Sequence, residues 1–134
     1  MAKFMVTITI LFGGNNFNGR IFDSNFHHET INEILYYFQK IFQRAEHIGS
    51  KIFICGLIPR PKYPHLKKCF EKASSGIFQL SRQYKCATFI DCQSLFYDSQ
   101  GKILCHYFKK DLVHLNNVGS KILALHVFNV ITKK

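Results

Sequence analysis

The 134-residue sequence has no tryptophan, only three prolines and only 8 acidic residues. Because 18 Lys and Arg residues outnumber the Asp and Glu residues, the chain carries a formal net charge of +10. Such a surface repels itself unless salt or an anionic partner screens it. The basic residues are scattered, often in pairs, and form no long basic tract. A solvated basic surface is therefore favoured, and a non-catalytic binding module for nucleic acid or another anionic partner is kept as the alternative function.

Long hydrophobic runs and paired cysteine motifs are also missing. No apolar run reaches the roughly 20 residues needed to cross a bilayer, so we expect no membrane association. The five cysteines are odd in number and include no C-x-x-C pair, and the histidines lack the spacing of metal ligands. We therefore predict no disulfide framework, no metal and no cofactor. Free thiols in apolar segments fit a reducing compartment, so a cytoplasmic or nuclear location is expected.

What the sequence does contain is globular composition, with 47% hydrophobic and 15% aromatic residues. Its length fits a single domain over residues 1–134. Short, almost continuously apolar segments rich in β-branched residues alternate with segments of helical periodicity, which predicts a parallel α/β sheet covered by helices. We expect strands at 3–12, 51–58 and 86–91, helices at 29–45, 63–82 and 116–131, and a long loop at 93–110.

The strongest local motif is Asp111-Leu112-Val113-His114, followed by Leu115 to Gly119 at the start of the last predicted helix. An Asp-x-x-His spacing can place a carboxylate beside an imidazole, where it fixes the tautomer and stabilises the imidazolium formed in acyl transfer. The alternative is a surface histidine near an unrelated helix-start aspartate.

A second motif, Gly13-Gly14-Asn15-Asn16, follows the first predicted strand. Glycine permits a sharp turn, and an Asn amide presented there is a donor suited to an oxyanion hole. The plainer interpretation is a turn chosen for backbone reasons alone.

In this order, the two motifs resemble those of the SGNH/GDSL-type esterases. Gly13 to Asn16 is similar to that family's Gly-x-Asn-Asp turn, with Asn16 in place of its usual Asp, and Asp111 to Gly119 matches its Asp-x-x-His-x-Asn-x-x-Gly signature. The resemblance implies a three-layer, flavodoxin-like α/β/α fold and an ester hydrolase acting on a small ester substrate. It also implies that Asn15 donates to the oxyanion, that His114 is the general base and that Asp111 orients His114.

The family's nucleophile has no counterpart in this sequence. The resemblance places that serine in a Gly-Asp-Ser motif after the family's first strand, and none of the serines at 24, 50, 74, 75, 81, 94, 99 and 120 stands in such a setting. We therefore expect a partial domain, truncated at its N-terminus to about three strands with flanking helices, and weakly active or inactive. The missing strand would leave a sheet edge open to self-association or to a missing N-terminal segment. Cys105, in the same loop as the Asp-His pair, is a weaker candidate nucleophile.

Overall fold

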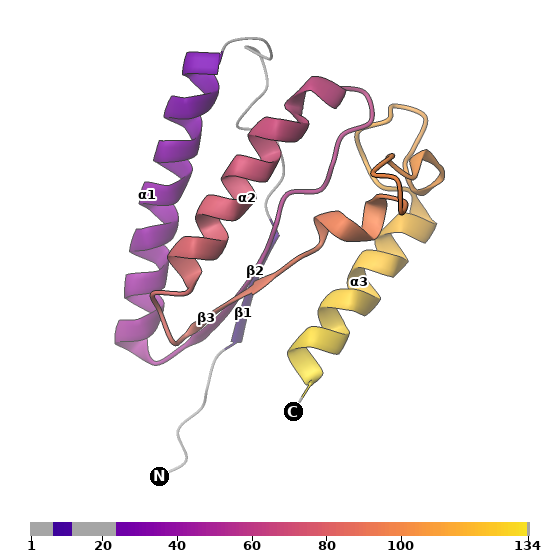
Figure 1. Ribbon diagram of the computed structural model, residues 1–134. Coiled ribbons are helices and arrows are strands. Elements are labelled where there is room, and N and C mark those ends of the chain that lie inside the picture. Colours follow the sequence, from indigo (N-terminus) through magenta and orange to yellow (C-terminus); the bar gives the residue numbers. More distant parts are fainter. Residues whose placement is uncertain (1–6, 12–23, 134) are drawn as a thin grey trace.

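The structure is a computed structural model in which residues 7–11 and 24–133 are described. Three parallel strands form one sheet in the order β1-β2-β3, and three helices accompany them (Figure 1). The predicted α/β class is confirmed. Within the described part of the chain, no helix combines the length and apolar character needed to cross a membrane. The elements are β1 (Thr7–Leu11), α1 (Ser24–Ile48), β2 (Lys51–Cys55), α2 (Lys67–Ser81), β3 (Ala87–Ile90) and α3 (Asn117–Thr132), with 3-10 turns at Pro64–Leu66, Gln93–Phe96 and Cys105–Tyr107.

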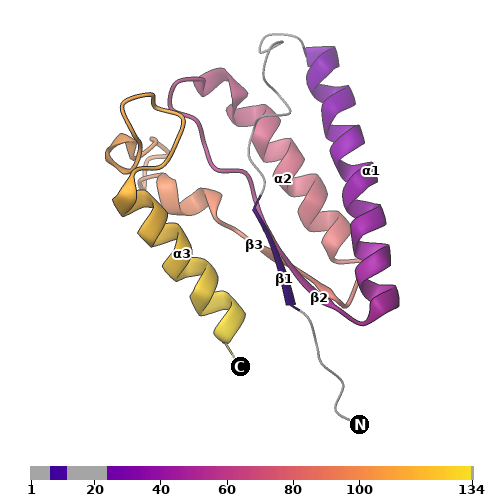
Figure 2. The same ribbon diagram turned by 180° about the vertical axis from the view of Figure 1, so that it is seen from behind.

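The central strand β2 explains why the sheet needs helices on both faces. Its side chains alternate between the two faces, and Ile52 and Ile54 on one face are as buried as Cys55 on the other. α1 and α2 cover the first face and α3 covers the second, as the two opposite views show (Figures 1 and 2). The almost continuously apolar sequence of β2 follows directly from this double burial.

α1 is held by a stripe of buried residues at three and four residue spacing. Phe38 and Phe42 lie on this stripe with their ring centroids 5.9 Å apart, and Phe42 is fully buried. The helix starts at Ser24, earlier than the predicted Glu29. The buried side chain of Thr30, one turn before Ile34, extends the stripe towards the N-terminus, which a count of strongly apolar residues misses.

α2 runs without a break through Ser74-Ser75-Gly76, where the sequence predicts weak helix. Ser74 is buried, and its Oγ accepts a hydrogen bond of 3.1 Å from the backbone N–H of Leu57. The side chain of Leu35 on α1 lies within 3.1 Å of where a Cβ on Gly76 would stand. Small residues are used here because α1 and the β2 loop approach α2 closely. Tertiary packing thus outweighs the low helix propensity of this segment.

The remaining predicted boundaries differ from the structure by a few residues. The strand predicted at 51–58 ends at Cys55, the one predicted at 86–91 spans Ala87–Ile90, and the second helix predicted at 63–82 is a 3-10 turn followed by α2. Of the strand predicted at 3–12, residues 7–11 are described, and the turn at Gly13 to Asn16 lies outside the described residues.

Candidate functional site

Asp111 and His114 come together in the loop that leads into α3. Nδ1 of His114 lies 2.6 Å from Oδ2 of Asp111. An ionised carboxylate can only accept a hydrogen bond, so the proton of this contact belongs to Nδ1. In the neutral imidazole, Nε2 is then the free acceptor, which is the arrangement a general base requires.

The same carboxylate also fixes the backbone that carries the imidazole. Its Oδ1 accepts hydrogen bonds from the backbone N–H groups of Val113, at 2.9 Å, and His114, at 3.0 Å. Between the two residues of the pair, Leu112 has a φ of 57°, a left-handed conformation that is strained for a side chain of this kind. Three hydrogen bonds to one carboxylate, all within four residues, offset this strain and hold the loop in a tight turn.

Contacts outside the motif close the loop further. The N–H of Lys109 donates to the carbonyl of His114 at 2.8 Å, and the N–H of Lys62 donates to the carbonyl of Leu112 at 2.9 Å. Lys62 lies after β2, far away in sequence, so the second contact ties the loop to the carboxyl end of the sheet. In parallel α/β folds this end is where ligands gather.

Asn116 is a structural residue of the site whose role the sequence interpretation missed. Its Oδ1 accepts the N-cap hydrogen bond of α3 from the N–H of Gly119 at 2.9 Å. Its Nδ2 donates to the carbonyls of His106, at 2.7 Å, and Phe108, at 3.3 Å. One side chain therefore joins the start of α3 to the segment before the Asp111 turn. An Asn at the start of a predicted helix is the sequence signal that could have identified the cap, whereas the two carbonyl contacts depend on how the loop folds.

Gly119 completes this junction by letting two segments approach closely. A Cβ on Gly119 would collide with the backbone carbonyl oxygen of Tyr107. The N–H of Asn116 donates to that same carbonyl oxygen at 2.9 Å. Gly119 is needed here because it has no side chain. Its backbone conformation does not require glycine, because its φ is not positive.

The Asp111–His114 pair is open to solvent, with side chains 44% and 71% exposed, respectively. The hydrogen bond from the His114 ring, followed by the backbone N–H groups of His114 and Val113, lowers the pKa of the Asp111 carboxyl below its usual value. Asp111 is therefore ionised at neutral pH. Water screens an exposed ion pair strongly. The contact therefore orients the His114 ring but adds only a weak electrostatic interaction.

The other predicted site residues have different outcomes. Asn15 lies outside the described residues. Among the side chains that the structure describes, no hydroxyl and no thiol is hydrogen-bonded to His114. Cys105 is exposed, and its role as a nucleophile stays a prediction. Across the same described residues, no cluster of His, Cys, Asp and Glu could hold a metal ion.

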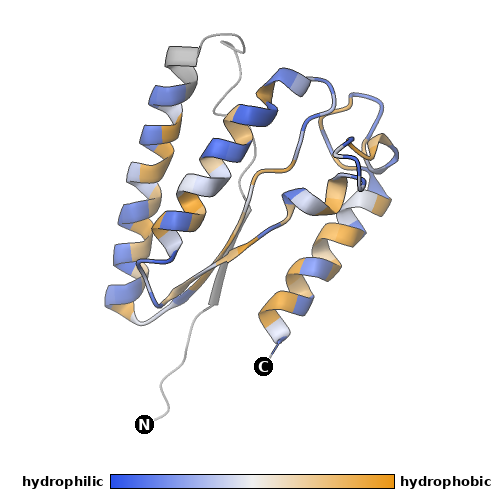
Figure 3. Cartoon of the chain, in the orientation of Figure 1, coloured by the Kyte–Doolittle hydropathy of each residue, from blue (hydrophilic) through white to orange (hydrophobic). Residues whose placement is uncertain are grey.

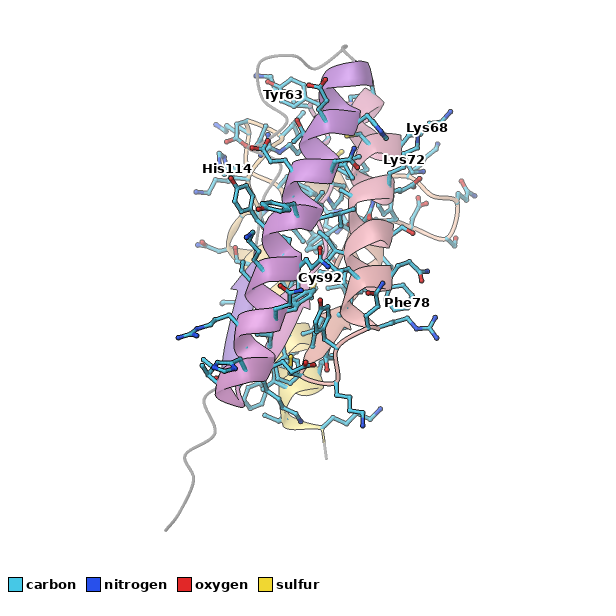
Figure 4. The ribbon with its side chains drawn as sticks, turned by 90° about the vertical axis from the view of Figure 1, so that its left-hand side faces the viewer. Tyr63, Lys68, Lys72, Phe78, Cys92 and His114 are labelled. Carbon is cyan, nitrogen blue, oxygen red and sulfur yellow. The ribbon has the colours of Figure 1, made fainter. Side chains whose placement is uncertain are left out.

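A separate hollow of about 350 Å³ lies between α2 and the carboxyl end of β3. It is lined by Gly56, Ser74, Ser75, Phe78, Phe89, Asp91 and Gln93. In Figure 4, His114 and Phe78, which is one of these lining residues, stand at opposite sides of the view. Neither Asp111 nor His114 lines the hollow.

Comparison with known proteins establishes the fold of this chain and no family. No family model matches the sequence. No curated protein matches it either. Among solved structures, the chain is similar to a protein from Streptococcus pneumonia that is provisionally described as a platelet activating factor, with a TM-score of 0.69 and 16% sequence identity.

That similarity covers 94% of this chain and 59% of the Streptococcus protein. The chain thus spans 59% of the length of the neighbour it matches. At this level of identity the likeness establishes a shared α/β fold.

Proposed function

We propose that residues 1–134 form the part of an SGNH-type ester hydrolase domain that carries its Asp-His pair. The observation that carries this proposal is the 2.6 Å contact between Asp111 and His114, in a turn that leads directly into the last helix. The α/β fold shared with the Streptococcus protein supports the architecture that this proposal requires. The flavodoxin-like arrangement of the complete sheet is part of the proposal.

In this function, His114 acts as the general base through Nε2, and Asp111 holds the ring and stabilises the imidazolium. Asn15 would donate to the oxyanion of the tetrahedral intermediate. The substrate class is a small ester. The reaction needs a nucleophilic hydroxyl beside Nε2, and residues 1–134 contain no Gly-Asp-Ser motif that would supply it.

We therefore expect residues 1–134 alone to have little or no esterase activity. Removing the nucleophile of a triad lowers the rate by several orders of magnitude, and what remains comes from binding and oxyanion contacts. The test is hydrolysis of p-nitrophenyl acetate by the purified chain, beside His114→Ala and His47→Ala. His47 is an exposed histidine on α1 and controls for the slow reaction of any surface imidazole with this ester.

Equal, slow rates for all three proteins are the expected result. Turnover that depends on His114 and not on His47 would contradict the expected inactivity. The hydrolase assignment has a separate test, in which upstream sequence with a Gly-Asp-Ser motif is added to the chain. If the assignment is correct, the longer protein should hydrolyse the ester, and His114→Ala should abolish this activity. Activity that is indifferent to His114 in such a longer protein would reject the assignment.

A further inference from the structure

Positive charge is divided unequally between the two helices that cover the first face of the sheet. α1 contains two Lys or Arg residues and three Glu residues. From residue 67 to residue 85, α2 and the turn after it contain five Lys or Arg residues and one acidic residue, Glu71. In Figure 3, hydrophilic segments recur in blue along α2, whereas β2 and β3 behind it are hydrophobic. Hydrolysis of a small ester does not use this surplus of charge, which is complementary to an anionic partner.

The lysines at the N-terminal end of α2 are available to such a partner. Lys67, Lys68 and Lys72 are exposed, and among the described residues none of the three forms an ion pair with a carboxylate. Lys68 and Lys72 are four residues, or about 6 Å, apart along one flank of the helix. In Figure 4, these two lysines stand on the same side of the view as Phe78 and opposite His114.

Two neighbouring hollows form a groove between α2 and the segment that follows β3. The first is the hollow of about 350 Å³ described above, which is within the size range of small-molecule sites, about 300–1,000 Å³. The second, of about 240 Å³, shares Asp91 and Gln93 with the first and extends to Lys67 and Tyr97. We call the two hollows together the α2 groove.

Aromatic rings stand at both ends of the α2 groove. At one end, the rings of Phe78 and Phe89 are 5.5 Å apart and edge to face, and Phe78 is 40% exposed. The Arg82 guanidinium lies 5.7 Å from the centroid of the Phe78 ring. At the other end, Nζ of Lys67 lies 5.2 Å from the centroid of the Tyr97 ring. Each end thus combines an aromatic ring with a cation, which is the composition of sites that bind single-stranded nucleic acid.

Polar groups lie between these two ends. Oδ1 of Asp91 accepts hydrogen bonds from the backbone N–H groups of Gln93, at 3.2 Å, and Ser94, at 3.4 Å, which fix the carboxylate beside the groove. Among the described residues, Asp91 has no ion-pair partner and the side-chain amide of Gln93 makes no hydrogen bond. A carboxylate and an amide can both pair with the edge of a nucleobase, which carries N–H donors and acceptor atoms.

The carboxylates of the α2 groove discriminate among anionic partners. Asp91 and Glu71 would repel the carboxylates of an acidic peptide. A membrane surface is bound by a broad apolar face, whereas in α2, all of whose residues are described, Phe78 is the one exposed large hydrophobic side chain. Nucleobases are neutral and donate N–H groups, so they suit the groove, and phosphates suit Lys68 and Lys72 outside it.

We propose that the α2 groove and the lysines beside it bind single-stranded nucleic acid. A base enters the larger hollow and stacks on Phe78, with its edge towards Asp91 and Gln93. The phosphates on either side of this base contact Lys68 and Lys72. This binding site is separate from the proposed hydrolase function and uses none of its residues.

The test measures the binding of fluorescein-labelled single strands of about 12 nucleotides to the purified full chain by fluorescence anisotropy. A mixed-sequence strand is compared with an abasic strand of the same length, which keeps the phosphates and has no bases. We expect the mixed-sequence strand to bind about tenfold more tightly, because only its bases can stack in the groove.

Substitutions of Phe78 locate the stacking site. Phe78→Leu keeps an apolar side chain and removes the ring, so it should weaken binding of the mixed-sequence strand about tenfold and leave that of the abasic strand unchanged. Phe78→Tyr keeps the ring and should bind both strands as the unchanged protein does. Phe128→Leu, at a ring that is 61% exposed on α3, is the matched control and should change neither affinity.

A salt titration tests the phosphate contacts. Lys72→Gln removes one of them and should lower the slope of log K against log salt concentration by about 0.7. Lys121→Gln removes an exposed lysine from α3 and should leave this slope unchanged.

Several results would overturn the proposal. These are equal affinities for the two strands, equal effects of Phe78→Leu and Phe128→Leu, equal slopes for Lys72→Gln and Lys121→Gln, or tighter binding to phosphatidylserine vesicles than to the mixed-sequence strand. Circular dichroism checks the fold of each variant, and the comparison of the two strands needs no variant, so it decides even if Phe78→Leu does not fold. No measurement involves ester hydrolysis, so the proposed hydrolase function can fail independently.

Discussion

Replacing Asn116 tests whether the Asp111 turn is tied to α3 as described. Loss of a helix N-cap costs about 1 kcal/mol. Each of the two lost hydrogen bonds to the His106 and Phe108 carbonyls adds about 0.5–1 kcal/mol, because water can replace part of them. Asn116→Ala should therefore destabilise the protein by roughly 2–3 kcal/mol, or about 10 °C in Tm for a chain of this size. Urea unfolding followed by circular dichroism measures this change.

Asn116→Asp separates the two roles of this side chain. Asp is as good an N-cap as Asn, so a residue that only caps α3 would tolerate the change. A carboxylate, however, has no N–H to donate and would face the two carbonyl oxygens that now accept from Nδ2. We expect a loss of about 1–2 kcal/mol. Asn117→Asp, at the exposed next position, makes the same charge change without these contacts and is the control.

If the free energy of unfolding of Asn116→Asp lies within about 0.5 kcal/mol of that of the unchanged protein, the hydrogen bonds from Asn116 to the two carbonyls do not stabilise the loop, and this role is refuted. The imidazole ¹⁵N resonances of His114 give a second readout. If Asn116 positions the turn, the Nδ1 signal should lose its hydrogen-bonded character in Asn116→Asp and keep it in Asn117→Asp.

Four further predictions follow from single contacts. Gly119→Ala should cost about 1–3 kcal/mol in urea unfolding, because its Cβ meets the Tyr107 carbonyl and the backbone must shift. Phe42→Ala, in the centre of the α1 core, should cost about 3–5 kcal/mol in the same assay. The Asp111 carboxyl, followed by ¹³C NMR, should titrate below the ordinary value of about 3.9. Because its pKa is lowered by folding, its contribution to stability is present above that pH and is lost as the pH falls further. A thiol reagent at pH 7.5 should label the exposed Cys105 first, whereas burial raises the pKa of the Cys69 thiol to about 11 and should delay its reaction until unfolding.

The class of fold was predictable because buried faces of helices and strands require apolar residues at regular spacing in the sequence. Ile34, Phe38 and Phe42 recur at helical spacing, and all three are buried on one face of α1. The continuous apolar run around Ile54 indicated a strand covered on both faces. Element ends were less predictable, because a side chain such as Thr30 joins a buried stripe through its surroundings rather than its polarity.

Within the candidate site, the Asp-His contact was predictable and its scaffold was not. Asp111 and His114 are three residues apart, so a single turn is enough to join them. The hydrogen bond from Lys62 to Leu112 joins residues 50 positions apart, and those from Asn116 join residues 8 and 10 positions apart. These contacts depend on the folded path of the chain. Likewise, the buried hydroxyl of Ser74 satisfies the N–H of Leu57 only because α2 lies against the end of β2.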